Sequence, residues 1–352
     1  MTKYKALANE FRSNIQRGIW KPGDRLKTEM ELSNEIGVSR QTVRQALEIL
    51  STEGLIDRIQ GSGTYISRSR SAEASAAVRN HTPSKIIGLI TSYIDYYIFP
   101  QNLNPIKDEL NKEGYYILLS ETKNRVSVER EVLRDMLNQP IDGLIVECSD
   151  CGHPNPNVDL YDQFREKGVP VLFTNGAYSN DPQSVSVSAD DSAGGYWLTQ
   201  RFIQEGCKSI GGIFKNDLHG NNRYYGCIKA ILDAGLPLEE DSFLWFSLKE
   251  SEAYMEMYAG RFGLDVLAHQ DAVVCYNDLA AINLYRLFQQ YGYTKIPRIA
   301  CFDNTNCLSE YPSFAALTYP SEQLGRRAAQ KLLAMLKEET VESEVIPWME
   351  MM

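Results

Sequence analysis

The chain has 352 residues, of which 43% are hydrophobic, and this size favours more than one folded domain. No apolar run is long enough to span a membrane, and no N-terminal stretch has the apolar centre of a signal peptide, so we expect a cytoplasmic protein. The four histidines are dispersed and the seven cysteines are scattered, which argues against a zinc site and predicts free thiols without a metal or other cofactor.

Charge is distributed unevenly along the chain. Residues 1–70 contain twelve Lys or Arg and eight Asp or Glu, whereas the rest contains 24 and 38, which gives a net charge of −10. A small basic region attached to a large acidic one predicts a nucleic-acid-binding module joined to a domain with another task.

The N-terminal region is predicted to begin with two helices. Apolar residues recur at helical spacing over residues 3–17. Thr28 and Glu31 form a capping-box pattern at the start of a second helix, and Gly37 ends that helix. The side chains of this second helix expected to face inward are Met30, Leu32 and Ile36.

A third helix is predicted over residues 40–53, with Ser39 as its N-cap. Two short helices joined by a short glycine-containing turn form a helix-turn-helix. The sequence LIDRIQGSGTYIS then predicts a hairpin of strands 55–59 and 64–67 with a glycine-rich tip.

The start of the third helix carries a polar face that suits DNA. In a helix-turn-helix the second helix enters the major groove with its N-terminus first, and arginine matches the acceptors of guanine. Hydroxyl groups suit phosphates, although the arginines could also form a merely solvated face. The predicted DNA-binding residues are Thr28, Glu29, Ser39, Arg40, Gln41, Thr42, Arg44, Gly61, Ser62, Gly63 and Thr64.

The stretch KPGDRLKTEMELSNEIGVSRQTVRQALEILSTEGLIDRIQGSGTYIS resembles the winged helix-turn-helix head of the GntR family of bacterial repressors. That family's pattern runs P-G, L-P-S-E, V-S-R-x-T-V-R-x-A-L, E-G-L and G-x-G-T-[FY]-[VI]. Lys27 stands where the family usually has proline. The resemblance implies that residues 1–67 form a winged helix-turn-helix domain that binds DNA.

Residues 68–84 are rich in serine and alanine and are predicted to form a linker. From residue 85 to residue 352, apolar β-type runs alternate with helical stretches, which predicts parallel α/β units arranged in two lobes. The predicted strands are KIIGLIT, YYILLS, DGLIVE, VPVLFT, SVSVS, SIGGIF, FLWFS, AVVCY and RIACF.

Polar and aromatic residues follow these strands, at the ends where open α/β sheets bind ligands. Asp, Asn and Arg pair with adjacent hydroxyl groups while a ring packs on the apolar face of a sugar, so the set suits a sugar. The predicted sugar-binding residues are Tyr93, Tyr97, Phe99, Glu147, Asn175, Lys215, Arg223, Asn277 and Asp303.

Structural alternatives stay open for several residues of this region. They are Asp278 as a helix N-cap, Glu147 and Lys215 as an ion pair, Asp190 and Asp191 as a helix start, Asp303 and Asn304 as a turn, and Tyr96 and Tyr97 as interface aromatics.

Residues 85–352, called the body below, resemble the LacI/GalR effector domain, which is related to periplasmic sugar-binding proteins. The matching motifs are IDGLIVE, VPVLFTN, a D-x-x-G-G helix start, R-x-x-G, CYND-x-x-A, F-D-N and P-x-x-x-L-G-x-x-A. In that family the residues matching Asn175, Arg223, Asn277 and Asp303 contact the sugar. A GntR head on such a body is typical of bacterial arabinose-responsive repressors, which implies L-arabinose as the effector.

The sequence therefore predicts a sugar-responsive transcriptional repressor. It would bind an inverted-repeat operator as a homodimer and be released by a monosaccharide, with L-arabinose expected. The alternatives are a regulator that responds to another pentose or a sugar derivative, and a solute-binding protein, which the body alone would allow. A sugar-modifying enzyme is disfavoured, because the sequence has no P-loop and no G-x-S-x-G motif.

Overall fold

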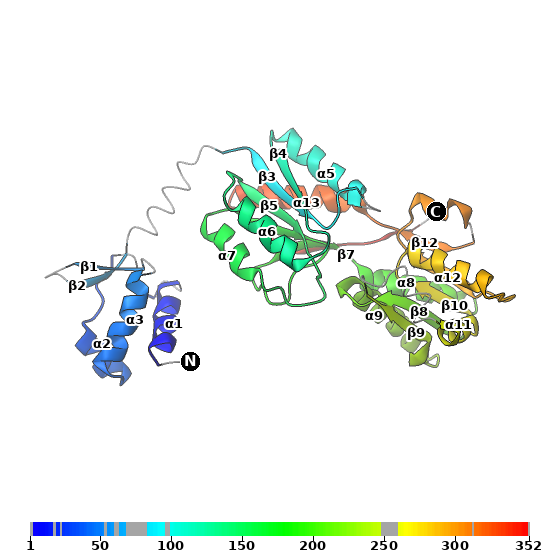
Figure 1. Cartoon of the computed structure of the whole chain (residues 1–352), viewed down its shortest axis with the longest axis horizontal. Coiled ribbons are helices and arrows are strands. Elements are labelled where there is room, and N and C mark those ends of the chain that lie inside the picture. Colours follow the sequence, from blue (N-terminus) through cyan, green and yellow to red (C-terminus); the bar gives the residue numbers. More distant parts are fainter. Residues whose placement is uncertain are drawn as a thin grey trace. The chain divides into compact units, whose positions relative to one another are not determined.

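The computed structural model of this chain divides into two compact units, Met1–Pro83 and Ser84–Met352, each with its own hydrophobic core (Figure 1). The structure describes residues 3–16, 19–21, 23–52, 55–59, 63–67, 83–95, 99–247, 260–311 and 313–350. Among these residues, no helix is both long and apolar enough to cross a lipid bilayer.

Three helices and a small sheet make up the N-terminal unit. They are α1 (Lys3–Gln16), α2 (Glu29–Ile36), α3 (Arg40–Thr52), β1 (Ile56–Ile59) and β2 (Gly63–Ile66). The two strands pair antiparallel, with Ile59 opposite Gly63, and Leu26 N–H donates to the Thr64 carbonyl at 2.8 Å. The predicted helix-turn-helix and hairpin are confirmed over the described residues.

The capping pattern of α2 is also confirmed. Thr28 Oγ1 accepts from the Glu31 N–H at 3.3 Å, and the Glu31 carboxylate accepts from the Thr28 N–H at 2.7 Å. Gly37 ends the helix at φ 72°, a left-handed conformation that glycine adopts without strain.

One expectation for α2 is wrong, because Met30 is 56% exposed. Leu32 is buried and Ile36 is half-buried, four residues further on along the same side of the helix. Residues two apart point in different directions from a helix, so Met30 and Leu32 cannot share one buried face.

The second unit consists of two lobes, each built on a six-stranded sheet. The first-lobe sheet has the strand order β13-β7-β6-β5-β3-β4 and is parallel throughout. Its elements are β3 (Ile86–Thr91), α5 (Phe99–Lys112), β4 (Tyr116–Glu121), α6 (Val126–Met136), β5 (Gly143–Glu147), α7 (Val158–Glu166), β6 (Val171–Thr174), β7 (Val185–Ala189), α13 (Ser321–Leu336) and β13 (Glu344–Ile346).

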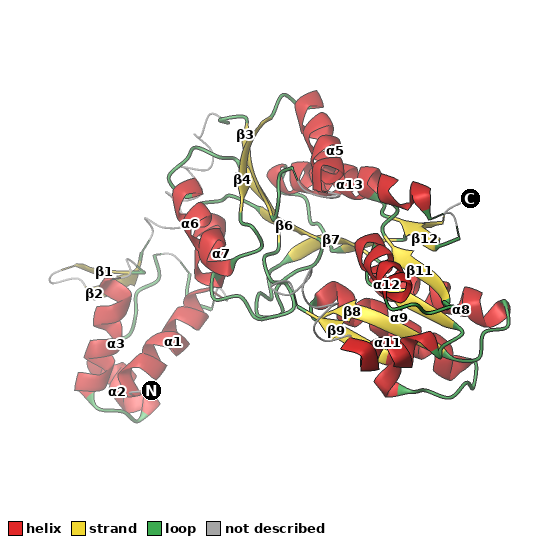
Figure 2. Cartoon of the chain, turned by 45° about the vertical axis from the view of Figure 1, so that its right-hand side comes forward, coloured by secondary structure: helices red, strands yellow, loops and turns green. Residues whose placement is uncertain are grey.

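Helices cover both faces of this sheet (Figures 1 and 2). Alternate side chains of a strand point to opposite faces. Ile87 and Leu89 pack in one cluster with Leu110 of α5 and Leu332 of α13. Ile90 packs in another cluster, with side chains of α6 and α7.

The second-lobe sheet has the order β14-β12-β11-β10-β8-β9 and is parallel except for β14. Its lobe comprises α8 (Asp191–Gln204), β8 (Ile210–Lys215), α9 (Leu218–Asp233), η1 (Glu240–Ser242), β9 (Phe243–Phe246), α11 (Gly260–Ala268), β10 (Ala272–Cys275), α12 (Asp278–Gln290), β11 (Arg298–Phe302), η3 (Asn306–Glu310), β12 (Ala315–Thr318) and β14 (Met349–Glu350). The predicted two-lobed α/β architecture and its nine strands are confirmed, and β12, β13 and β14 are additional.

Three crossings join the lobes within the described residues. The chain crosses from β7 to α8 next to Asp191, from β12 to α13 next to Tyr319, and from β13 to β14 next to Trp348. Each crossing leaves one sheet and enters the other lobe over a few residues, so these positions are where the lobes can turn relative to each other.

Two glycines bring α8 and α9 into close contact. A Cβ atom on Gly226 would lie 2.0 Å from the Ser192 carbonyl oxygen, and one on Gly195 would lie 2.1 Å from the Arg223 carbonyl oxygen. Only glycine permits this backbone approach, so the packing fixes the position of α9 against the first crossing.

Candidate functional site

The exposed face of α3 is polar, as a DNA-reading helix requires. Arg40, Gln41 and Arg44 are exposed, whereas Val43 and Leu47 are buried in the core of the unit. The helix is therefore held by its apolar side and presents its arginines to solvent.

The N-terminus of α3 and the hairpin provide further polar groups. Ser39 caps α3, because its Oγ accepts from the Thr42 N–H at 3.2 Å. Of the hairpin tip, Gly63 and Thr64 are described, whereas Gly61 and Ser62 lie outside the described residues. Gly63 has φ 132°, and a Cβ atom there would lie 2.9 Å from Arg25 Nε. Arg25, which the sequence analysis did not select, thus lies against the wing.

The predicted residues Thr28 and Glu29 lie at the start of α2, next to Lys27. Thr28 is engaged as the N-cap, and Glu29 begins the helix. Lys27 forms an exposed ion pair with Glu35, with Nζ and Oε2 2.7 Å apart. Such a surface pair contributes little to stability, so Lys27 can exchange this partner for a phosphate.

In the second unit, Glu147 and Asn175 meet at the carboxyl ends of β5 and β6. Asn175 Nδ2 donates to Glu147 Oε1 at 3.1 Å, and Thr91 Oγ1 and the Ser92 N–H donate to Oε2 at 2.7 and 2.9 Å. Burial raises the pKa of Glu147, and the bonds from Ser92, Thr91 and Asn175 oppose this rise.

Asn175 links this pair to the second crossing. Its backbone is left-handed, with φ 61°, a conformation that asparagine tolerates better than most residues. The Tyr319 hydroxyl donates to Asn175 Oδ1. A first-lobe side chain at the strand ends is thereby bonded to a residue about which the lobes can turn.

In the second lobe, Arg223 of α9 is the cation around which the other candidate site residues lie. It is 4% exposed; its Nε donates to Asp191 Oδ1 at 2.9 Å, and its Nη1 donates to the Tyr276 carbonyl oxygen. The guanidinium carbon lies 4.6 Å from the ring centre of Tyr276, 4.4 Å from that of Phe302 and 5.1 Å from that of Trp348. These contacts fix the plane of the guanidinium.

Asp191 is shared between Arg223 and His219, which lie four residues apart on α9. Its Oδ2 is 2.7 Å from His219 Nδ1. Burial opposes ionisation of Asp191, but Arg223 and His219 outweigh burial and hold the pKa of Asp191 below its ordinary value. Burial also disfavours the imidazolium, yet Cys151 and Asp191 outweigh it and raise the pKa of His219.

Lys215 and Asp217 form a second charged pair, 2.6 Å apart. Asp217 also caps α9 by accepting from the Gly220 N–H at 2.8 Å, and its Oδ2 accepts from the Tyr276 hydroxyl at 3.1 Å. Glu147 has other partners, so the alternative of a Glu147–Lys215 ion pair is wrong in this arrangement.

Asn277, rather than Asp278, caps α12. Its Oδ1 accepts from the Ala280 N–H at 2.9 Å. Asp278 is buried and accepts from the Thr305 N–H at 3.0 Å, so the alternative that Asp278 is the N-cap is wrong. The cap uses Oδ1 of Asn277 and not its amide nitrogen, which is the type of group that donates a hydrogen bond to a ligand hydroxyl.

Asp303 follows β11 and is buried in a left-handed backbone conformation, with φ 58°. Burial alone would lower the pKa of Arg223, but the charges of Asp191 and Asp303 raise it above the ordinary value. The neighbouring Asn304 donates through Nδ2 to Thr318 Oγ1 at 3.2 Å.

The aromatic residues predicted for the first lobe are only partly described. Tyr93 follows β3 and is half-buried. Tyr96 and Tyr97 lie outside the described residues, and Phe99 begins α5 with its side chain outside them.

Some side chains at this site were not predicted, among them Asp191, His219, Phe302, Tyr319 and Trp348. The helix start at Asp190 and Asp191 was recognised as a structural feature, and Asp190 does cap α8, accepting from the Ala193 N–H at 2.9 Å. The sequence carried no sign that the adjacent Asp191 turns inward to Arg223.

The lobes also meet at the N-terminus of α9. A Cβ atom on Gly176 would lie 2.7 Å from Leu218 Cδ2, and one on Gly152 would lie 3.1 Å from the Asp217 Cα atom. Both glycines belong to first-lobe loops, so the two lobes touch beside the Asp191 and Arg223 cluster.

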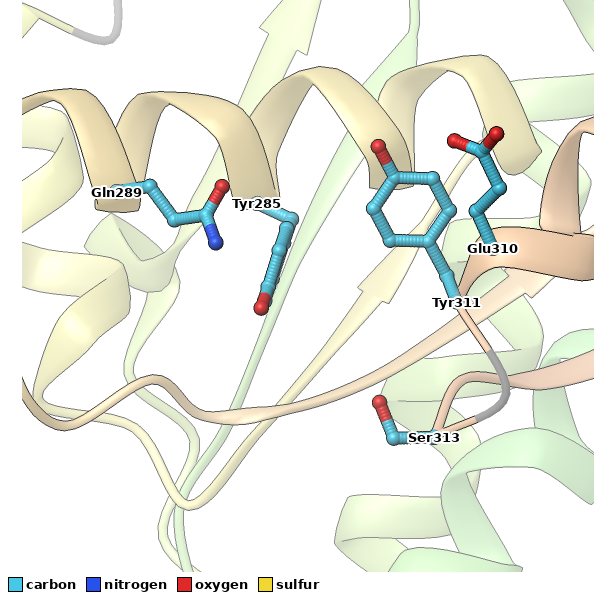
Figure 3. A pocket seen from close by; sticks show the side chains of 5 residues that line it. All are labelled: Tyr285, Gln289, Glu310, Tyr311 and Ser313. Atoms are coloured by element: carbon cyan, nitrogen blue, oxygen red, sulfur yellow. The ribbon is translucent and has the colours of Figure 1, made fainter.

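A separate pocket of about 410 Å³ lies in the second lobe (Figure 3). Tyr285 and Gln289 reach it from α12, and Glu310, Tyr311 and Ser313 from the segment that follows β11. Tyr285 is eight residues along α12 from Asn277, which is about 12 Å of helix. This pocket contains none of the predicted sugar-binding residues.

Residues 84–349 match the family model of periplasmic binding proteins and the sugar-binding domain of the LacI family, and residues 3–66 match that of the gntR family of bacterial regulatory proteins. The chain belongs to the bacterial regulators that join these two domains. The regulator is 32% identical over 347 residues to an arabinose metabolism transcriptional repressor of Geobacillus stearothermophilus, covering 97% of this chain and 93% of that protein.

A second relative with the same name, from Halalkalibacterium halodurans, is 30% identical over 343 residues and covers 96% of the regulator and 90% of its own length. Among solved structures, the CelR–cellobiose complex has a TM-score of 0.67 at 18% identity and covers 93% of the regulator and 99% of that chain. A LacI-type protein of Alkaliphilus metalliredigens complexed with D-xylulofuranose has a TM-score of 0.62 at 20% identity, over 76% of the regulator and 98% of that chain. These structures share its fold.

The raised pKa of His219 predicts a pH-dependent stability. An unfolded chain releases a histidine proton near pH 6.5, so the imidazolium beside Asp191 stabilises the fold fully below about pH 6.5. That contribution is lost as the pH rises through the raised pKa of His219. His219→Asn retains an amide donor for Asp191 but cannot titrate. Its melting temperature should therefore fall less between about pH 6 and about pH 9 than that of the wild type.

The matched control is His269→Asn, because His269 is exposed. It should reproduce the wild-type profile of melting temperature against pH. Identical profiles for the wild type and His219→Asn would contradict the assigned role of His219.

Proposed function

We propose that this regulator is a sugar-responsive transcriptional repressor that L-arabinose releases from its operator, and that it catalyses no reaction. The main support for sugar binding is the buried Arg223, which Asp191 holds among the polar residues at the strand ends of the second unit. Two relatives that are 32% and 30% identical over almost the whole chain are arabinose metabolism transcriptional repressors, which supports arabinose over other sugars.

The site chemistry fits a neutral polyol better than a charged ligand. Arg223 and Asn175 offer N–H groups, whereas Glu147, Asp217 and Asp303 offer carboxylate oxygens, so donors and acceptors occur together. A sugar hydroxyl both donates and accepts, and adjacent hydroxyls suit planar amide, carboxylate and guanidinium groups. The rings of Tyr276, Phe302 and Trp348 lie next to Arg223 and provide apolar surface. We assign the effector to this group of residues around Arg223, rather than to the tyrosine-lined pocket of Figure 3.

For operator DNA, the proposal places α3 in the major groove. Arg40 and Arg44 would bond base edges, and Ser39, Thr42 and the wing residue Thr64 would contact phosphates. The exposure of both arginines and the burial of the opposite side of α3 support this orientation. The repressor would act in the cytoplasm, where bacterial operators lie.

We further propose that the repressor is a homodimer that binds an inverted repeat. Strand β4 is at one edge of the first-lobe sheet, and its Tyr116 and Leu119 are 72% and 37% exposed. An edge strand with exposed apolar side chains is suited to pairing with a second copy. Two heads related by a two-fold axis match two half-sites of opposite orientation.

Sugar release is explained by a difference in sugar affinity between two arrangements of the lobes. Sugar between Arg223 and Asn175 would favour the closed arrangement, and closure would change the spacing of the two heads. A coupling of about 1–3 kcal/mol between the two ligands is typical for such regulators.

Operator titration with and without L-arabinose tests this proposal. We expect saturating L-arabinose to weaken operator binding of the wild type by roughly 5- to 150-fold. Arg223→Ala should retain operator binding but lose the sugar response. Arg44→Ala is the matching arginine-to-alanine change in the N-terminal unit. It should lower operator affinity by roughly 5- to 150-fold and leave sugar binding unchanged. Operator affinity of the wild type that does not change with saturating sugar would contradict the proposal.

The dimer proposal predicts that a charge on the exposed edge separates the subunits. Leu119→Lys should shift the sedimentation of the protein from dimer towards monomer, because two lysines would face each other across the two-fold axis. Operator affinity should fall with it, whereas sugar binding should not change. A Leu119→Lys protein that remains dimeric would show that the subunits pair elsewhere.

A further inference from the structure

All three crossings between the lobes lead to one cluster around Arg223. From the first crossing, the buried carboxylate of Asp191 binds Arg223 Nε at 2.9 Å. From the third, the ring centre of Trp348 lies 5.1 Å from the guanidinium carbon. From the second, the ring of Tyr319 lies 5.2 Å from that of Trp348, and its hydroxyl bonds Asn175.

Arg223 has little freedom to move within this cluster. Its Nε and Nη1 are bonded to Asp191 and to the Tyr276 carbonyl, and these bonds use two of the five N–H groups of a guanidinium. The remaining N–H groups can donate to a sugar hydroxyl. Because Gly226 seats α9 directly on α8, Arg223 cannot shift without moving the helix that begins at Asp191.

Trp348 has its own unexplained polar group. It is 9% exposed, and its Nε1 is buried without a hydrogen-bond partner among the described residues. A buried N–H in a native protein normally has a partner, so this N–H is a candidate donor to a ligand oxygen. The ring packs edge-on against Phe302, with centres 5.0 Å apart, and a Cβ atom on Gly194 would lie 3.1 Å from it.

We propose that Asp191 and Trp348 are positioning residues of the sugar site, which hold Arg223 at the crossings so that a bound sugar acts directly on the segments about which the lobes turn. The inference rests on the proposed function. Turning the lobes changes the backbone next to Asp191 and Trp348 and so displaces the groups that hold Arg223. By the same linkage, sugar on Arg223 favours the arrangement in which both residues hold it.

Two adjacent carboxylates provide a matched pair of variants. Asp191→Asn keeps the size of the side chain and one acceptor oxygen but removes the charge that Arg223 and His219 share. Asp190→Asn makes the same change one residue earlier, where the side chain caps α8. Asparagine caps a helix about as well as aspartate, so Asp190→Asn should behave as the wild type.

Calorimetric titration with L-arabinose and operator titration at saturating L-arabinose are the two measurements. For Asp191→Asn we expect sugar affinity to fall roughly 10- to 100-fold, the loss of a charge-assisted bond that holds the binding group. We also expect sugar to release operator incompletely at saturation. If Asp191→Asn only weakened sugar binding through a structural defect, saturating sugar would still release the operator to the same extent as in the wild type.

Trp348 supplies a second variant, which decides the matter if Asp191→Asn fails to fold. Trp348→Leu removes the aromatic face beside Arg223 and should weaken sugar binding by roughly 2- to 10-fold and reduce operator release at saturation. Trp348→Phe retains an aromatic face and is the matched control, which should lie between Trp348→Leu and the wild type. Circular dichroism and melting temperatures establish that each variant is folded.

The outcomes separate this inference from the function on which it rests. If the wild type responds to sugar and Asp191→Asn or Trp348→Leu responds equally, the positioning role is contradicted while the repressor function stands. Equal losses of sugar affinity and of operator release in Asp190→Asn and Asp191→Asn would also contradict the positioning role. They would show that any change at the start of α8 has the same effect. If the wild type responds neither to L-arabinose nor to a panel of other monosaccharides, both the function and this inference fail.

Discussion

The ion pair between Asp191 and Arg223 is the interaction on which the proposed sugar site of the second unit depends. Two buried charges are costly to desolvate, and such a pair often contributes less to stability than apolar side chains of similar size. Here the pair joins the start of α8 to α9 next to a crossing, with His219 and three aromatic rings around it. We infer that the pair serves specificity, because it gives one rigid donor group a defined position between the lobes.

The two units divide the charge of the chain between them. The basic N-terminal unit carries exposed arginines on α3, whereas the acidic second unit has Glu147, Asp217 and Asp303 at the ends of its strands. The proposed sugar site therefore combines donors and acceptors, and the proposed DNA-binding face is positively charged. The lobes touch again near the Arg223 cluster, where Gly152 and Gly176 approach the start of α9.

Local patterns predicted most of the fold but only part of the site. The capping box at Thr28, the left-handed Gly37 and nine strands followed from short-range periodicity, which is strong in these segments. Strands β13 and β14 escaped prediction because they have three and two residues, too few to show a period. Asp191 and Trp348 were not predicted because their contacts with Arg223 form only where segments distant in the sequence meet. No short stretch of sequence distinguishes Asp191, which turns inward, from Asp190, which caps a helix.

A crystal structure of the full chain with L-arabinose tests the central claim most directly. The account predicts sugar density between the Arg223 guanidinium and the Glu147–Asn175 pair, with Asp191 still bonded to Arg223 and the crossings turned relative to the sugar-free protein. Sugar bound in the tyrosine-lined pocket at Tyr285 and Tyr311, with the Arg223 cluster unoccupied, would contradict it.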